Sequence, residues 1–158
     1  MNQNLQMRHA SVLNVDSGHY LEMSIRIRDG KIVEMDKTLS NAKDEKIIDL
    51  KGKYVLPGLI DSHVHVIANS ANLDKLKTLS PSYVALAAAK NMKDMLYRGF
   101  TSVRDMGGAD FGLANAQIEG TLIGPRLFFC GRALSLSSGH GDSRMGGENS
   151  IENNCHFG

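Results

Sequence analysis

The sequence is poor in several residues that mark particular classes of protein. Among its 158 residues it has no tryptophan, three prolines and two cysteines. Cys130 and Cys155 do not form a CxxC pair, so we expect two free thiols in a reducing compartment, neither a zinc knuckle nor a disulfide framework. No apolar run approaches the roughly 20 residues that span a bilayer. The first residues contain no apolar segment of a secretory signal. These absences predict a cytoplasmic protein without a membrane partner.

The sequence also lacks a surplus of charge of either sign. Lysine and arginine number 18 against 17 acidic residues, which gives a formal net charge of +1. A nucleic-acid interface needs a clustered basic face, so we exclude nucleic acid as a partner. A hydrophobic content of 42% and a charged content of 22% are typical of a folded globular domain. Glycine is abundant, with 16 residues, and its concentration in the last third predicts loops there.

Short strands and tight turns characterise the first part of the chain. The expected strands cover residues 9–15, 19–28, 31–35, 47–50 and 53–56. Within the second of these, four apolar residues alternate with four polar ones: Leu21, Met23, Ile25 and Ile27 with Glu22, Ser24, Arg26 and Arg28. This period of two predicts one buried face and one face toward solvent. Asp29-Gly30 is typical of a hairpin turn. We expect a small antiparallel β-unit over residues 1–56.

The pattern changes at Pro57-Gly58. Residues 59–68 are apolar on both faces, as expected of a parallel strand covered by helices. A helix should begin after Ser80 as N-cap, with Pro81 at its first position, and end at Gly99. Its inward stripe comprises Val84, Ala88, Met92, Met95 and Leu96. A strand (100–104), a helix (111–119) and a strand (126–130) follow. This order predicts an α/β fold in which residues 57–158 open a parallel sheet or barrel.

A His-x-His triplet is the sharpest chemical signal. Side chains two apart on a strand point to the same side, so His63 and His65 should project together near the carboxyl end of their strand. Barrel active sites lie at that end, and two imidazoles form half of a site for zinc or a similar divalent ion. Two unrelated histidines on a strand remain the alternative from these residues alone. Asp61 should share their face at a deeper level, as a second-shell or structural carboxylate.

The surrounding residues resemble a known family. Pro57-Gly58-Leu59-Ile60-Asp61-Ser62-His63-Val64-His65, directly after a β-unit, resembles the Pro-Gly-x-x-Asp-x-His-x-His strand of the amidohydrolase superfamily. Residues 99–108 are similar to the second barrel strand of its branch with imidazolonepropionase-like enzymes and Xaa-Pro dipeptidases. Residues 124–127 and 138–142 fit the third strand and its loop. The resemblance implies a sandwich-type β-unit (1–56) and the first portion of a TIM-like (β/α) barrel (57–158), with His63 and His65 as metal ligands.

The resemblance also implies parts that this sequence does not contain. A complete site of that branch is expected to hold two divalent ions, most readily zinc, with a carbamylated lysine from the fourth strand. Histidines from strands five and six and an aspartate from strand eight complete the expected set. A (β/α) barrel needs roughly 250 residues, and no lysine follows Lys93. We therefore expect the N-terminal part of a longer enzyme, with no complete catalytic set and little or no hydrolase activity on its own.

Several weaker candidates follow the triplet. His140, in a glycine-flanked loop after the third strand, is either a substrate or oxyanion contact or an exposed loop histidine. Arg104 is either a substrate contact or, with Asp105, a structural ion pair or loop anchor; Asp105 is also a second-shell candidate. Asp142 and Arg144 are weaker functional candidates. His9, His19 and His156 are expected at the surface.

The function implied is hydrolysis of amide bonds by a metal-activated water. The expected substrates are small molecules, namely dipeptides such as Xaa-Pro or N-acyl amino acids, and the complete enzyme could be a homo-oligomer. A cyclic-amide hydrolase or deaminase of the same superfamily is one alternative. A non-catalytic binding remnant is the other.

Overall fold

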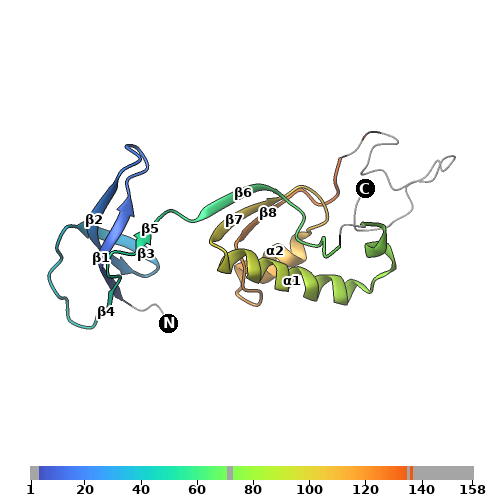
Figure 1. Ribbon diagram of the computed structural model, residues 1–158. Helices are drawn as coiled ribbons and strands as arrows, with labels where there is room; N and C mark the ends of the chain where they lie inside the picture. The colour runs from blue at the N-terminus through green and yellow to red at the C-terminus, as the bar shows by residue number, and fades with distance from the viewer. Residues whose placement is uncertain (1–3, 71–72, 135, 137–158) are drawn as a thin grey trace. The chain divides into compact units, whose positions relative to one another are not determined.

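The computed structural model describes residues 4–70, 73–134 and 136 of the chain. The chain divides into two compact units between Pro57 and Gly58. The N-terminal unit is a β-sheet, and the C-terminal unit combines a second sheet with helices (Figure 1). This mixed α/β architecture confirms the predicted fold class. No helix in the described ranges is both long enough and apolar enough to cross a membrane.

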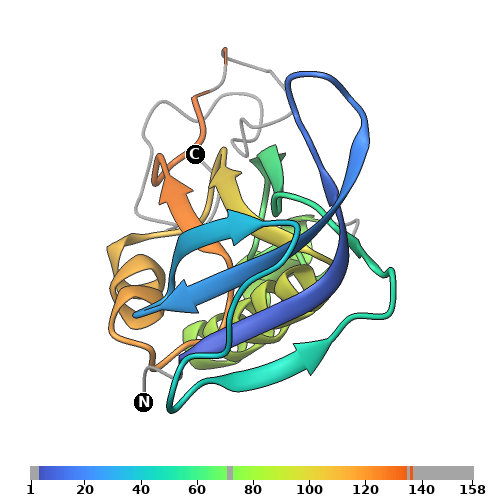
Figure 2. The same ribbon diagram turned by 90° about the vertical axis from the view of Figure 1, so that its left-hand side faces the viewer.

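The N-terminal sheet has five strands in the order β3-β2-β1-β4, with β5 also paired to β1. They are β1 (Leu5–Leu13), β2 (Tyr20–Arg28), β3 (Lys31–Asp36), β4 (Lys46–Asp49) and β5 (Tyr54–Val55). β1 and β2 run side by side as the long strands of the sheet (Figure 2). The pairs β1–β2 and β2–β3 are antiparallel. At Asp29-Gly30, φ values of 50° and 72° confirm the predicted hairpin turn.

The prediction of a wholly antiparallel unit was wrong. β4 and β5 both run parallel to β1. β3 and β4 lie at opposite edges of the sheet, so no tight turn can join them. Residues 37–45 cross the sheet from β3 to β4. Local residue patterns predicted where the strands lie, but strand direction depends on this connection, whose path is set by tertiary contacts.

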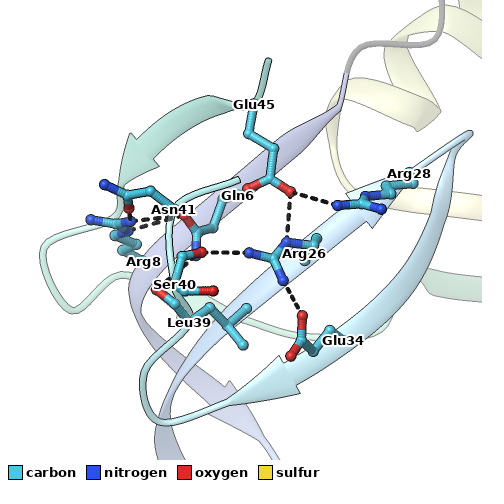
Figure 3. A network of polar contacts seen from close by, with 9 residues as sticks. All are labelled: Gln6, Arg8, Arg26, Arg28, Glu34, Leu39, Ser40, Asn41 and Glu45. Carbon is cyan, nitrogen blue, oxygen red and sulfur yellow. Dashed lines mark hydrogen bonds and ion pairs between the residues drawn. The ribbon is translucent and has the colours of Figure 1, made fainter. Parts of the chain in front are cut away.

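The prediction that the polar residues of β2 face solvent was wrong for Ser24 and Arg26, whereas Glu22 and Arg28 are exposed. Ser24 and Arg26 are only 4% and 7% exposed. Figure 3 shows the reason: the Arg26 guanidinium donates to Glu45 Oε1 at 2.6 Å and to the Ser40 carbonyl at 2.5 Å, and it also pairs with Glu34. The connection 37–45 therefore covers this face and is held there by polar contacts.

Glu45 is the main acidic partner in this network (Figure 3). Burial alone would raise the pKa of its carboxyl group, but the hydrogen bond and positive charge of Arg26 lower it below the ordinary value. The hydrogen bond with Glu45 likewise raises the pKa of Arg26. On the same face, fully buried Gln6 accepts from Arg8 at 2.9 Å and donates to the Leu39 carbonyl at 3.3 Å. Charged and amide groups thus take the place of an apolar layer on this side of the sheet.

The C-terminal unit contains a parallel sheet of three strands in the order β6-β7-β8. Its elements are β6 (Leu59–Val64), the 3-10 helix η1 (Leu73–Thr78), α1 (Pro81–Tyr97), β7 (Phe100–Asp105), α2 (Phe111–Ile118) and β8 (Arg126–Phe129). The predicted alternation of strands and helices is confirmed. β6 is shorter than predicted because the chain turns directly after it, where the Ala68 amide donates to the His65 carbonyl at 3.0 Å.

Helix α1 follows its predicted pattern closely. Val84, Ala88 and Met92 are buried on the side that faces the sheet. Ser80 and Pro81 occupy the predicted cap and first positions, although the Ser80 hydroxyl makes no capping bond. The helix ends at Tyr97 with Arg98 as its C-cap, and Gly99 follows with φ of 98°, a conformation that favours glycine.

Both helices pack on one face of the β6–β8 sheet (Figure 1), where their apolar residues join those of the strands in one core cluster. Within the described ranges no helix covers the opposite face. Leu59 and Ile60 in β6 are 51% and 74% exposed, and Phe128 in β8 is 53% exposed. The prediction that this first strand is covered on both faces was therefore wrong for Leu59 and Ile60.

Candidate metal centre

His63 and His65 lie at the carboxyl end of β6, as predicted. Their ring centroids are 5.4 Å apart and the ring planes are inclined by 76°. His63 is exposed and His65 is half-buried. The structure therefore places two imidazoles next to each other at the strand end, where two nitrogen donors could reach one ion. Their role as metal ligands stays a prediction.

A β-bulge positions the first histidine. Asp61 lies opposite Val103 of β7, whereas Val64 lies opposite Asp105, so β6 has one residue more than β7 in this interval. Such a bulge redirects side chains. The Asp61 carboxylate accepts from the His63 amide at 3.0 Å. The alternation that predicts a shared face for Asp61 and the histidines is broken here, and Asp61 instead contacts the backbone of His63.

Arg104 holds the same bulge from the neighbouring strand. Its Nε donates to the Ser62 carbonyl at 2.8 Å, while its side chain is exposed. This contact corresponds to the loop-anchor alternative. Among the described residues Arg104 is not paired with Asp105, because Asp105 accepts from backbone amides instead. A substrate contact by Arg104 stays a prediction.

A backbone carbonyl orients the second histidine. His65 Nδ1 lies 2.9 Å from the Gly107 carbonyl oxygen. A carbonyl can only accept, so this contact requires the proton on Nδ1 and puts the lone pair of the neutral ring on Nε2. Metal-ligating histidines are commonly fixed in this way by a carbonyl or carboxylate partner. The tautomer of His65 is therefore the one suited to ligation through Nε2.

The Asp105 carboxylate fixes the loop that carries the Gly107 carbonyl. The side chain is fully buried at the end of β7. Its Oδ2 accepts from the Val66 amide at 2.7 Å, and its Oδ1 accepts from the amides of Gly107 and Ala109 at 2.9 and 3.1 Å. One carboxylate thus joins the turn after His65 to the loop whose carbonyl holds the His65 ring. That Asp105 supports a metal ligand through these hydrogen bonds stays a prediction.

The described residues bring two candidate metal ligands together, His63 and His65. Within the described part of the chain, no group of three or more histidine, cysteine, aspartate or glutamate side chains comes together. Zinc sites use three or four protein ligands, so the two imidazoles would form half of one. Their neutral nitrogen donors fit zinc or a similar divalent ion. His140, Asp142 and Arg144 lie outside the described residues.

Two groups at this site were not predicted from the sequence. One is the Gly107 carbonyl, because a backbone acceptor leaves no trace in residue type. The other is Asn91 of α1, whose Nδ2 donates to the Val66 carbonyl at 3.0 Å. Asn91 is a polar residue within the inward stripe of the helix, directly before buried Met92. A polar residue at such a position indicates a buried hydrogen-bond partner, and that signal could have identified it.

Comparison with known proteins now assigns the family. Residues 54–155 match the family described as the Amidohydrolase family, which is well over half of the chain. The chain belongs to the amidohydrolase family. The resemblance inferred from the Pro-Gly-x-x-Asp-x-His-x-His segment is confirmed.

This amidohydrolase resembles solved structures and curated relatives along different lengths. A prolidase complexed with N-methylphosphonate-L-proline is 39% identical with a TM-score of 0.87, over 94% of this chain and 37% of that chain. A Xaa-Pro dipeptidase with bound methionine in the active site is 25% identical with a TM-score of 0.67, over 82% of this chain and 34% of that chain. Adenine deaminase of Lactobacillus delbrueckii subsp. bulgaricus is 40% identical over 62 residues, 39% of this chain and 11% of the deaminase. The chain thus spans just over a third of the solved structures and a ninth of the curated relative.

Proposed function

We propose that this chain provides the first two metal ligands of a hydrolase that cleaves carbon–nitrogen bonds. The observation that carries the proposal is the pair His63 and His65, with rings 5.4 Å apart and the second ring fixed through Nδ1. Membership of the amidohydrolase family supports it. We assign zinc as the ion because imidazole nitrogen suits it.

The residues of this chain bind and orient. His63 and His65 would each donate a ring nitrogen, and the Gly107 carbonyl would keep His65 in the required tautomer. A divalent ion, when bound, lowers the pKa of a water molecule and polarises the scissile carbonyl. The Ser62–His63 peptide is held at both its polar groups: its amide donates to Asp61 and its carbonyl accepts from Arg104. Together these contacts restrict the movement of the backbone that carries the His63 ring.

The proposed substrates are dipeptides such as Xaa-Pro or N-acyl amino acids. The similar prolidase, complexed with a proline phosphonate, supports this choice over most of the chain. We further propose that residues 1–56 are part of a composite β-sandwich and that residues 57–158 are the first portion of the barrel. A cytoplasmic location, inferred from the cysteine usage, completes the proposal.

Deamination of a small heterocycle is the second candidate, and the match to an adenine deaminase favours it. Release of proline from aminoacyl-proline dipeptides, measured beside release of ammonia from adenine, separates the two. These assays need the chain together with whatever sequence supplies the remaining ligands. Turnover of adenine with no turnover of any dipeptide would overturn the first choice in favour of the second.

Site-specific zinc binding tests the ligand assignment directly. We expect Zn²⁺ added to the purified chain to shift the ring ¹⁵N resonances of His63 and His65 together, and either replacement by alanine to abolish the shift of the other ring. His19→Ala is the matched control, because His19 is an exposed histidine of the N-terminal unit. Zinc-dependent shifts that leave the two rings unaffected would refute the assignment.

A further inference from the structure

The turn after His65 is held at more points than a surface turn requires. Residue Val66 is fully buried, and both polar groups of its backbone are engaged by side chains. Its amide donates to Asp105 Oδ2 at 2.7 Å, and its carbonyl accepts from Asn91 Nδ2 at 3.0 Å. Ordinary turns satisfy such groups with water or with their own backbone. Here two different elements, β7 and α1, contribute one side chain each.

The two contacts lie on opposite sides of one residue and act on the backbone that carries the His65 ring. The Val66 amide belongs to the peptide unit that begins at His65. The Val66 carbonyl belongs to the next unit, so the two bonds fix consecutive peptide planes. The Met106 amide also donates to the Val64 carbonyl at 3.0 Å, which fixes the peptide on the preceding side. The position of the His65 Cα is therefore determined from both directions along the chain.

The same carboxylate connects this backbone to the ring. Asp105 Oδ1 accepts from the Gly107 amide, and the Gly107 carbonyl accepts from His65 Nδ1. A charged acceptor makes stronger hydrogen bonds than a neutral one, and burial excludes water that would compete. Asp105 thus fixes both ends of His65, its main chain and its ring.

We propose that Asn91 and Asp105 are positioning residues that together set the place and tautomer of His65. We call this pair the Val66 clamp. The inference rests on the proposed function, because it assigns the clamp to a metal ligand. Neither residue touches the expected ion or substrate. Each acts through the Val66 backbone, and Asp105 acts additionally through the Gly107 carbonyl.

Two conservative variants separate the halves of the clamp. Asn91→Ala removes the donor and introduces a better helix former, so α1 should keep its stability. Asp105→Asn keeps the shape but turns at least one N–H donor toward a backbone N–H. Asn115→Ala, at an exposed position of α2, and Asp94→Asn, at a surface pair with Lys90, are the matched controls. We expect about tenfold weaker Zn²⁺ binding at His65 in each clamp variant and unchanged binding in each control.

Two further measurements need no metal. Ring ¹⁵N shifts should show one Nδ1–H tautomer of His65 in the parent chain and a mixture of tautomers in Asp105→Asn. Hydrogen exchange of the Val66 amide should accelerate in Asp105→Asn and stay slow in Asn91→Ala, which touches only the carbonyl. A merely stabilising role would lower the midpoint of unfolding without changing zinc affinity or tautomer in the folded chain.

The outcomes distinguish a failure of the Val66 clamp from a failure of the proposed metal-binding function. If the parent chain binds zinc through His63 and His65 but both folded clamp variants bind it equally well, the clamp is wrong and the ligand assignment stands. If the parent binds no zinc at these rings, the proposed function fails, while the tautomer and exchange data still decide the clamp. Should Asp105→Asn not fold, Asn91→Ala alone decides: unchanged affinity there overturns the proposal.

Discussion

Replacing Gly107 by alanine should disturb the candidate metal centre through a single atom. A Cβ at this position would lie 2.6 Å from the Cβ of Ala133 and 3.3 Å from its Cα. Carbon atoms at rest are about 3.5–4.0 Å apart, so the two segments must separate by about 1 Å. The Gly107 carbonyl accepts from His65 Nδ1 at 2.9 Å. If the Gly107 loop takes up the shift, that distance exceeds the range of a hydrogen bond.

The expected cost has two parts. Overpacking of this kind destabilises a protein by about 1–3 kcal/mol, which urea unfolding of Gly107→Ala would measure. Loss of the carbonyl partner should weaken zinc binding at His65 by about 10–100-fold, which a titration followed through the ring ¹⁵N resonances would measure. The change in zinc affinity is measured on the folded chain in the absence of urea.

Two variants show whether the clash is the cause. Gly112→Ala places a Cβ 3.2 Å from Asp110 Oδ1, the atom that caps α2, so it could cost about 1 kcal/mol of stability, but it touches neither His65 nor its partners and zinc affinity should not change. Adding Ala133→Gly to Gly107→Ala removes the closest contact and should restore part of the affinity. Undiminished zinc binding by a folded Gly107→Ala chain would refute the reasoning, and so would a double variant no better than the single one.

Three further outcomes follow from packing, capping and charge. Met92→Ala should cost about 2–5 kcal/mol in denaturant unfolding, because Met92 is fully buried, while Leu86→Ala, at a position 73% exposed, should cost under about 0.5 kcal/mol. Asp110→Ala should cost about 1 kcal/mol, since its carboxylate caps α2 at the Leu113 amide, whereas Ser80→Ala should be nearly neutral because its hydroxyl caps nothing. Folding lowers the pKa of the Glu45 carboxyl group, so its ionised form stabilises the N-terminal unit at pH values above the ordinary pKa of 4.5. That stability is lost as the pH falls through the lower pKa of the folded state. In Glu45→Gln, circular dichroism between neutral and acid pH should no longer show this loss.

Local patterns predicted the C-terminal unit well. Helix α1 begins and ends within two residues of the expected positions, because a proline, a glycine and an apolar stripe all agree. The period of two in β2 predicted the strand and the burial of Ile25, yet not the burial of Arg26. Whether an arginine on a strand meets water or a carboxylate depends on Glu45, which is 19 positions away. Such a partner is invisible to a pattern read within one strand.

The candidate site was predictable in its residue types and less so in its geometry. Spacing indicated that His63 and His65 lie together, and their rings do. That spacing implies regular alternation, whereas a bulge between Asp61 and Val64 includes His63 itself. Register between two strands depends on both strands at once, so the bulge could not be seen in β6 alone. The Val66 clamp escaped for a similar reason: its contacts end on backbone atoms, which every residue has.

The direction of the imidazoles depends on how many residues β6 has between two fixed register positions. Val64 and Asp105 share a register position, as do Asp61 and Val103, with three steps on one strand and two on the other. Deleting Ser62 would equalise the steps and remove the bulge together with the Ser62 carbonyl that Arg104 holds, so the His63 backbone would lose the contacts that now set its position. An insertion or deletion between Asp61 and Val64 should therefore separate the two imidazoles even where both histidines are kept.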